Sequence, residues 1–252
     1  YKCVLNDEFS DASMVFQNFG LMPHRTVLEN GMYGLNIQGV TSGEAEKRTK
    51  HWLNRVGLSG FEDRYPGQLS GGMQQRVGLA RALATDADIL LMDEAFSALD
   101  PLIRADMQAI LLDLQDELHK TIVFITHDLD EALRIGDDIA ILRDGELIQK
   151  GSPQNIVLKP ADDYVADFTK DVNRARVLTL NILSHEAGSK EGLALDGDLP
   201  IEQAMQQMVD SKYNLVTVMK DNKPIGQVSL RDMVGAISRP KTTESGSTKT
   251  YR

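Results

Sequence analysis

The sequence predicts an α/β fold, and two apolar segments with a helix between them carry that prediction. Residues 88–92 contain a continuous apolar run, Ile89 to Met92, flanked by acids, and residues 121–126 are a run of apolar or β-branched side chains; both are typical of fully buried parallel strands. Asp100 and Pro101 are an N-cap followed by proline at the first helical position, and apolar side chains then recur at helical spacing. Strands that alternate with helices indicate a parallel sheet packed against helices.

The segment before residue 88 supplies one strand and two helices. Residues 14–16 are a short apolar run that ends at Gln17, and a loop containing Gly20, Pro23 and Gly31 is expected after it. Residues 44–56 place apolar side chains on one helical face, with Gly57 as the stop.

Ser70 is a natural N-cap for a further helix that begins near Gly72 or Met73. After the second strand, residues 128–135 are expected to form a short helix closed by Gly136. Residues 139–142 and 146–149 then predict a hairpin that turns at Asp144 and Gly145.

The chain changes character after Pro160. Residues 171–181 are interpreted as a connector, and a small domain of β-α-β-β-α type follows. Its expected elements are a helix over 200–210, strands over 215–219 and 225–230, and a last helix over 232–237. Residues 240–252 are rich in Lys, Thr, Ser and Gly, so disorder is expected there.

Composition narrows the class of protein. The 252 residues carry a formal net charge of −10, which disfavours a nucleic-acid partner. Cys3 is the single cysteine and is interpreted as a small apolar filler in a reducing compartment, since no internal disulfide can form. Because no apolar run is long enough to span a bilayer and no signal peptide opens the chain, membrane association is expected to come through a partner protein.

Two adjacent acids follow the first predicted buried strand. Asp93 and Glu94 are costly at the end of an apolar strand unless a ligand binds there. One interpretation is a nucleotide-hydrolysis site in which Asp93 holds Mg²⁺, directly or through water, and Glu94 polarises the attacking water. The alternative is a solvated strand end with a capping acid.

Two further polar residues end neighbouring strands. His127 follows the run at 121–126, so it is expected near Glu94, where it can touch a terminal phosphate and hold the water. Gln17 carries a neutral amide that can bridge a metal ion and a water. Taken alone, His127 is equally a cap or a hydrogen-bonded core histidine, and Gln17 alone is a weak signal.

Ser70, Gly71 and Gly72 precede a helix and form a possible anion nest. Backbone N–H groups converge at such a helix start, and the helix dipole favours negative charge. The alternative is an ordinary capped helix start.

The order of these motifs resembles the ATP-binding subunit of ABC transporters. The resemblance covers about residues 12–160: MVFQ is similar to the Q-loop, LSGGMQQ to the signature, ILLMDE to Walker B, SALD to the D-loop and THD to the H-loop. Longer stretches, such as LMDEAFSALDPLIR, resemble the importers of glycine betaine, proline betaine, proline or choline, in which CBS-type regulatory sequence follows the cassette. The step from Gly226 to Asp232 is similar to the end of a CBS domain, where an Asp often contacts ribose; for Asp232 a plain N-cap acid is preferred.

The resemblance implies a set of functions and partners. It implies ATP and Mg²⁺ as ligands, Glu94, His127 and Gln17 as catalytic residues, and Asp93 and Gln17 at the metal. The implied nucleotide contacts are Leu69, Ser70, Gly71, Gly72, Met73, Gln74, Gln75 and Asp100. It further implies a head-to-tail pair with a second ATP-binding subunit, transmembrane permease subunits, indirectly a substrate-binding protein, no nucleic acid, and a peripheral place on the cytoplasmic face of the inner membrane.

The resemblance also divides the chain and exposes one departure from the family. The implied divisions are an ATP-binding cassette at 1–165, a connector at 166–184, a CBS-like domain at 185–239 and a disordered tail at 240–252. The sequence contains no G-x-x-x-x-G-K-[ST], the Walker A loop, and it begins with Tyr1, so N-terminal truncation is the interpretation. Two copies of this sequence facing each other are therefore expected to be inert. Two alternatives stay open, a soluble ABC ATPase of another process and a regulatory or binding module with an inactive cassette.

Overall fold

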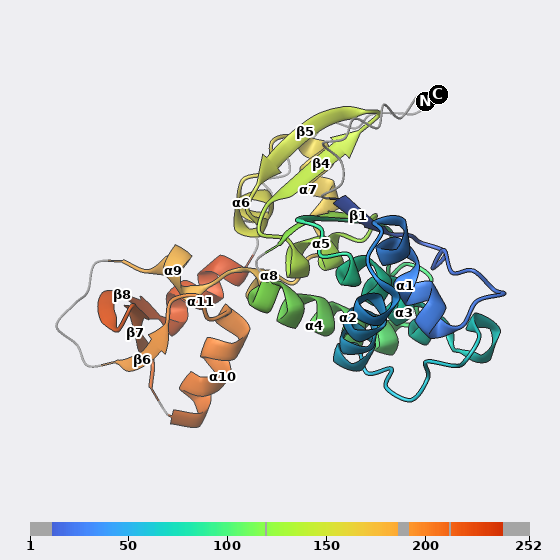
Figure 1. Cartoon of the computed structure of the whole chain (residues 1–252). Coiled ribbons are helices and arrows are strands. Elements are labelled where there is room, and N and C mark those ends of the chain that lie inside the picture. The colour runs from blue at the N-terminus through green and yellow to red at the C-terminus, as the bar shows by residue number, and fades with distance from the viewer. Residues whose placement is uncertain (1–11, 119, 186–191, 212, 239–252) are drawn as a thin grey trace, which may run out of the picture. The chain divides into compact units, whose positions relative to one another are not determined.

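The computed structural model describes residues 12–118, 120–185, 192–211 and 213–238 (Figure 1). Its contacts divide the chain into two compact units, Tyr1–Gly136 and Asp137–Arg252. This division falls earlier than the predicted boundary after residue 165, and the predicted domain boundaries stay predictions. Cys3 and the tail expected over 240–252 lie outside the described residues. In the described ranges, no helix combines the length and the apolar character that crossing a bilayer requires.

Unit 1 confirms the predicted α/β class. Its strands are β1 (Ala12–Val15), β2 (Ile89–Asp93) and β3 (Thr121–Ile125), and they form a parallel sheet in the order β1-β2-β3. Its helices are, in chain order, α1 (Val27–Ile37), α2 (Ser42–Arg55), the 3-10 helix η2 (Pro66–Gln68), α3 (Gly71–Ala84), α4 (Pro101–Leu118) and α5 (Leu129–Ile135).

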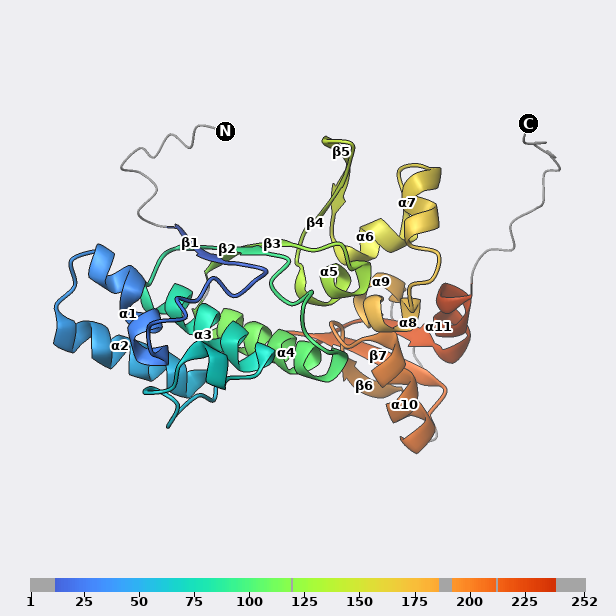
Figure 2. The ribbon, with the colours of Figure 1, turned by 90° about the vertical axis from the view of Figure 1, so that its right-hand side faces the viewer.

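One face of the sheet is closed by helices. In Figure 2, α3 and α4 run below β1, β2 and β3. Val15, Leu90 and Met92 point from the strands into the core, where each is at most 2% exposed. Phe96 and Phe124 complete this core with ring centroids 5.4 Å apart. Burial of this face is the main stabilisation of the unit, since each large side chain removed from water contributes about 1.5–3 kcal/mol.

The other face of the sheet corrects the prediction of fully buried strands. Side chains that alternate with the core residues are exposed on it: Met14, Ile89, Leu91, Val123 and Ile125. Ile125 is the most open of them at 56% exposure. The apolar runs therefore mark strands correctly, but the described residues bury only one of their two faces.

A second correction concerns the loop predicted after Gln17. The structure forms α1 there, with Thr26 as its N-cap and Glu29 completing a capping box. Gly31, taken as a loop residue, lies inside this helix. A glycine is needed there because a Cβ would clash with the Thr49 side chain of α2. Close packing of two helices explains that glycine, and the T-x-x-E spacing at 26–29 was the signal for the helix.

Unit 2 begins with a hairpin and ends with a small mixed sheet. Its elements are, in chain order, β4 (Ile139–Arg143), β5 (Glu146–Gly151), α6 (Pro153–Leu158), α7 (Asp163–Phe168), α8 (Arg174–Val177), α9 (Leu180–Leu183), β6 (Leu193–Asp196), α10 (Ile201–Ser211), β7 (Leu215–Lys220), β8 (Lys223–Ser229) and α11 (Leu230–Ile237). The predicted hairpin is confirmed: β4 and β5 are antiparallel, and both turn residues, Asp144 and Gly145, have positive φ.

The small sheet has the order β6-β7-β8, with β6 and β7 parallel and β7 and β8 antiparallel. Leu178 and Leu180, from the segment predicted as a connector, are fully buried in its core, so that segment packs as part of this unit. Asp232 accepts hydrogen bonds from the backbone and hydroxyl of Ser229, which caps α11 and lowers the pKa of the Asp232 carboxyl. The preferred interpretation of Asp232 as the N-cap acid is therefore wrong in position: Ser229 is the N-cap, and Asp232 completes the capping box from the third position of α11.

Candidate functional site

The polar residues at the ends of the three strands of unit 1 lie at one edge of the sheet. Gln17 follows β1, Asp93 ends β2 with Glu94 directly after it, and His127 follows β3. Because the strands are parallel and adjacent, these side chains meet where all three strands end.

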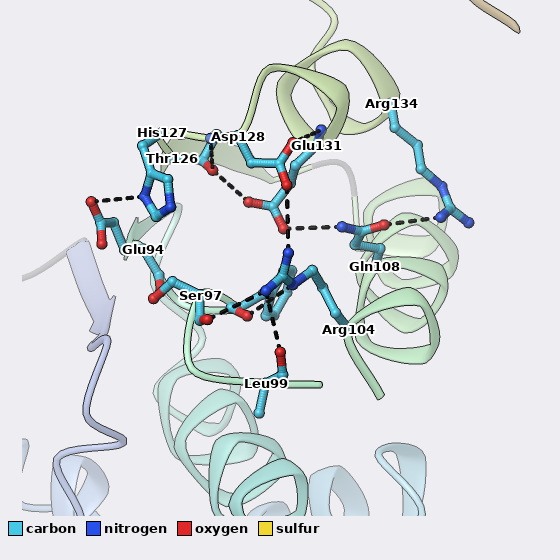
Figure 3. A network of polar contacts seen from close by, with 11 residues as sticks. Glu94, Ser97, Leu99, Arg104, Gln108, Thr126, His127, Asp128, Glu131 and Arg134 are labelled. Carbon is cyan, nitrogen blue, oxygen red and sulfur yellow. Dashed lines mark hydrogen bonds and ion pairs between the residues drawn. The ribbon is translucent and has the colours of Figure 1, made fainter. Parts of the chain in front are cut away.

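Glu94 is the centre of this edge. Gln17 Nε2 donates to Glu94 Oε2 at 2.8 Å. His127 Nδ1 lies 3.2 Å from Glu94 Oε1 (Figure 3). Gln17 Nε2 also donates to Ser97 Oγ at 3.2 Å. The strand order predicted that His127 lies near Glu94, and the family resemblance implied that Gln17 joins them; the structure brings all three together.

The backbone at Glu94 fixes where its carboxylate points. Glu94 has φ of +43°, a left-handed conformation that costs a non-glycine residue about 1–3 kcal/mol unless its surroundings hold it. Its N–H donates to Ile125 O of β3 at 2.9 Å. Its carbonyl accepts from the N–H and the hydroxyl of Ser97 at 3.1 and 2.8 Å. The neighbouring strand β3 and Ser97 of the same turn therefore hold the backbone at Glu94.

Asp93 keeps a free carboxylate at the same edge. It is partly exposed, and no hydrogen bond or ion pair engages it in the described part of the chain. No cluster of three or more His, Cys, Asp or Glu that could hold a metal ion occurs among the described residues. Mg²⁺ is usually held by one or two carboxylates together with water and substrate phosphates, so a lone accessible Asp93 fits that donor set.

The loop at the start of α3 is a capped helix N-terminus, as predicted. Ser70 Oγ accepts from the Met73 N–H at 3.3 Å, and Ser70 itself has extended backbone. Within the described residues, the N–H groups of Gly71 and Gly72 have no acceptor, as is usual at a helix start. Ser70 and Gly71 are exposed, so an anion can reach this helix start at Gly71, whereas Gly72 is buried.

The other residues implied to contact nucleotide differ in accessibility. Leu69 and Gln75 are buried, whereas Met73 and Gln74 are partly exposed. Gly72 is buried and packs closely against α4. A Cβ at this position would clash with the Ile103 side chain. The structure gives Leu69, Gly72 and Gln75 packing positions.

Asp100 is exposed at the start of α4. Its Oδ1 accepts from the N–H groups of Leu102 and Ile103, each at 3.2 Å. The predicted N-cap is therefore confirmed, and its implied nucleotide contact stays a prediction.

Sequence reasoning missed Arg81, which ties α3 to the segment after Gln17. Arg81 Nη1 donates to Gly20 O at 2.6 Å and Nη2 to Phe19 O at 3.2 Å. Phe19 and Gly20 both have positive φ, and burial lowers the pKa of Arg81. No pattern in the sequence singled out this arginine, because its acceptors are carbonyls that any residue carries.

A carboxylate held by an amide and an imidazole at the carboxyl edge of a parallel sheet is typical of nucleotide-hydrolysing α/β proteins. The exposed helix N-terminus at Ser70 is a second phosphate-binding feature in the same unit. The fold and the site thus place this chain in the α/β class with parallel sheets to which many nucleotide-binding proteins belong, with a small second domain.

The comparisons with known proteins identify the family. Residues 6–97 match the ABC transporter family and residues 189–239 match the CBS domain. The chain is 56% identical over 213 residues to the glycine betaine/carnitine transport ATP-binding protein GbuA of Listeria monocytogenes, an alignment that covers 84% of this chain. It is 63% identical over 167 residues, 66% of this chain, to the glycine betaine transport ATP-binding protein OpuAA of Bacillus subtilis.

A third relative is the glycine betaine/proline betaine transport system ATP-binding protein ProV of Escherichia coli, 45% identical over 228 residues and 90% of this chain. The chain spans 53%, 40% and 57% of the lengths of these three relatives. It belongs to the ABC transporter ATP-binding family and carries a CBS domain.

Proposed function

We propose that this chain is the ATP-hydrolysing subunit of an importer for a quaternary amine or related compatible solute, such as glycine betaine, proline or choline. The observation that carries the proposal is the Glu94 carboxylate, whose two oxygens lie next to Gln17 and His127. The substrate class is supported by the names of the relatives, which mention glycine betaine, carnitine and proline betaine.

In the proposed reaction, Glu94 polarises the water that attacks the terminal phosphate. Glu94 accepts a proton from this water as the new P–O bond forms and the bond to the leaving ADP breaks. Each Glu94 oxygen is contacted by one side chain and keeps a second lone pair, so the carboxylate can accept from the water while Gln17 and His127 stay in place. His127 is 70% exposed, so it is free to turn toward the phosphate and hold the water's geometry.

Asp93 would hold Mg²⁺, directly or through water, with the Gln17 amide as the second ligand group. The bound ion would supply neutralisation of the charge on the phosphate oxygens. The free carboxylate of Asp93 supports this assignment, because no internal partner competes for it among the described residues.

The Ser70 loop would act on an ATP held by a second subunit. The exposed helix start at Gly71, with Ser70 and Gln74 beside it, supports a phosphate contact. Two subunits would therefore pair head to tail, each placing its Ser70 loop opposite the other's nucleotide.

The membrane partners follow from the same proposal. Residues 19–30 would face the cytoplasmic coupling helix of a permease subunit, and a substrate-binding protein would deliver the solute from the other side. The chain would then lie peripherally on the cytoplasmic face of the membrane, held by the permease.

The test is ATP hydrolysis and solute uptake in liposomes by a transporter whose ATP-binding subunit includes a Walker A loop, because two copies of these residues without that loop are expected to be inert. Glu94→Gln is expected to lower kcat about 100-fold or more while ATP binding stays intact, because only the base is lost. Glu146→Gln, the same change at an exposed residue of β5, is the matched control. Normal steady-state turnover by the Glu94→Gln transporter would contradict the assignment.

A further inference from the structure

One guanidinium contacts two separate loops of the candidate site. Arg104, in the first turn of α4, donates from Nε to Phe96 O at 3.2 Å and from Nη2 to Ser97 O and Leu99 O at 3.3 and 3.2 Å. Its Nη1 lies 3.4 Å from Asp128 Oδ2 (Figure 3). Arginine suits this position because its planar fork presents five donors, whereas lysine presents three from a single atom.

The first of these loops carries Glu94. Ser97 donates to the Glu94 carbonyl from both its N–H and its hydroxyl, and the Leu99 N–H donates to Phe96 O. Arg104 takes three carbonyls of this same turn. Glu94 stands at the start of this turn and has a positive φ, which few residues adopt unless their surroundings hold them. A change in the turn is therefore expected to move Glu94.

The second loop carries His127. Its neighbour Asp128 donates from its N–H to Thr126 Oγ1 at 3.0 Å, and Thr126 Oγ1 donates to Glu131 Oε2 at 2.6 Å. The Glu131 N–H returns a hydrogen bond to Asp128 Oδ1 at 3.2 Å. The loop around His127 is therefore closed on itself, and Asp128 is its contact with Arg104.

A second side chain of α4 holds that loop as well. Gln108 Nε2 donates to Glu131 Oε1 at 3.0 Å, and Arg134 Nη1 donates to Gln108 Oε1 at 2.9 Å. Gln108 and Glu131 are each 6% exposed. Arg104 and Gln108 are four residues apart and so share one face of the helix, which makes α4 the common support of both loops.

We propose that Arg104 is a positioning residue that locks the Glu94 turn to the His127 loop and so sets the spacing of these two side chains. The proposal rests on the proposed function only for its effect on catalysis, since Arg104 does not itself contact the reacting atoms. Losing a residue that orients a catalytic group typically costs about 10- to 100-fold in activity. The loss should fall on kcat and leave the KM for ATP within about twofold.

The first test measures the lock without using activity. Hydrogen exchange of the full chain is compared for wild type, Arg104→Gln and Arg104→Lys, with Arg48→Gln of the exposed Arg48–Glu44 pair as control. Faster exchange is expected in both variants over residues 94–99 and also over 126–131. Faster exchange over 94–99 alone, or over neither segment, overturns the lock.

The second test measures kcat and KM for ATP in the assembled transporter, with melting temperatures of each variant. Arg104→Gln is expected to lower kcat about 10- to 100-fold at unchanged KM. If Arg104→Gln does not fold, Arg104→Lys and Asp128→Asn serve in its place, since Asn still caps α5 and weakens only the ionic contact. A KM increase with normal kcat, or no change in either, overturns the proposal. Failure of the proposed function is distinguishable, because wild-type turnover would then not depend on Glu94.

Discussion

The sheet edge at Glu94 and the loop at Ser70 are polar sites of unit 1 that differ in how many side chains of this chain complete them. At the edge, Gln17 and His127 from two other segments engage both oxygens of one carboxylate. At the loop, the side chain of Ser70 caps α3, and the neighbouring Gly71 is exposed without an acceptor for its N–H among the described residues. The difference teaches that a catalytic centre can be assembled within one chain, whereas a phosphate-binding helix start needs a ligand brought to it.

The largest expected effect comes from filling the loop. Ser70→Arg places a long side chain where a phosphate would sit, so hydrolysis by the assembled transporter should fall about 100-fold or more. The edge at Glu94 is untouched by this change, so ATP binding by the subunit itself should persist. ATP-driven pairing of subunits, followed by gel filtration or cross-linking, should be lost. Unimpaired pairing of the Ser70→Arg subunit would show that the loop does not face a partner.

Smaller losses are expected from the partners of Glu94. His127→Ala and Gln17→Ala each remove one contact to its carboxylate, and each should lower kcat about 10- to 100-fold, less than Glu94→Gln. Adding either change to Glu94→Gln should have little further effect, because the three act as a unit. Kinetics of the single and double variants measure this. Fully additive losses would mean that the three residues work separately.

A third expectation separates packing from phosphate binding at the loop. Gly72→Ala should destabilise the fold by about 1–3 kcal/mol, because its methyl group meets Ile103. Combining it with Ile103→Ala should cost less than the sum of the single changes, as chemical denaturation can measure. If the destabilisation by the double variant equals the sum of the two single changes, contact with Ile103 is not the reason for a glycine at position 72.

The smallest expected effect concerns Arg81, which connects α3, the helix that begins at the Ser70 loop, to the segment that follows Gln17. Arg81→Met keeps the apolar stem but loses the hydrogen bonds to Phe19 and Gly20, which should cost about 1 kcal/mol of stability. Hydrogen exchange should quicken over residues 16–20 and stay unchanged over 126–131. Equal quickening of both segments would mean that Arg81 supports the whole edge rather than the segment beside α3.

Local chemistry made part of this site predictable from sequence. Ser70 and Asp100 were recognised as caps because a capping side chain acts on N–H groups two or three residues away. Glu94 and His127 were expected together because parallel neighbouring strands end at one edge. The meeting of Gln17 with Glu94 rested on the resemblance to a family.

Long-range contacts set the limit of prediction. Whether Leu91 and Ile125 are buried depends on what lies over the sheet, which an apolar run does not encode. Arg104 contacts three backbone carbonyls and one carboxylate. Every residue has a backbone carbonyl, so the sequence does not show which carbonyls will accept a hydrogen bond. Gly31 was misread because glycine marks both loops and close helix contacts.

The central claim is that Glu94 of one subunit works with Ser70 of another, and mixed transporters test it most directly. In one mixture, one subunit carries Ser70→Arg and its partner carries Glu94→Gln. In the other mixture, a single subunit carries both changes and its partner is wild type. Single-turnover ATP hydrolysis is measured for each.

The account predicts that the first mixture keeps one intact site and hydrolyses ATP, whereas the second has a defect in both sites and does not. The opposite order, with activity only when both changes share one subunit, would contradict the account, since Glu94 and Ser70 would then serve the same nucleotide within one chain.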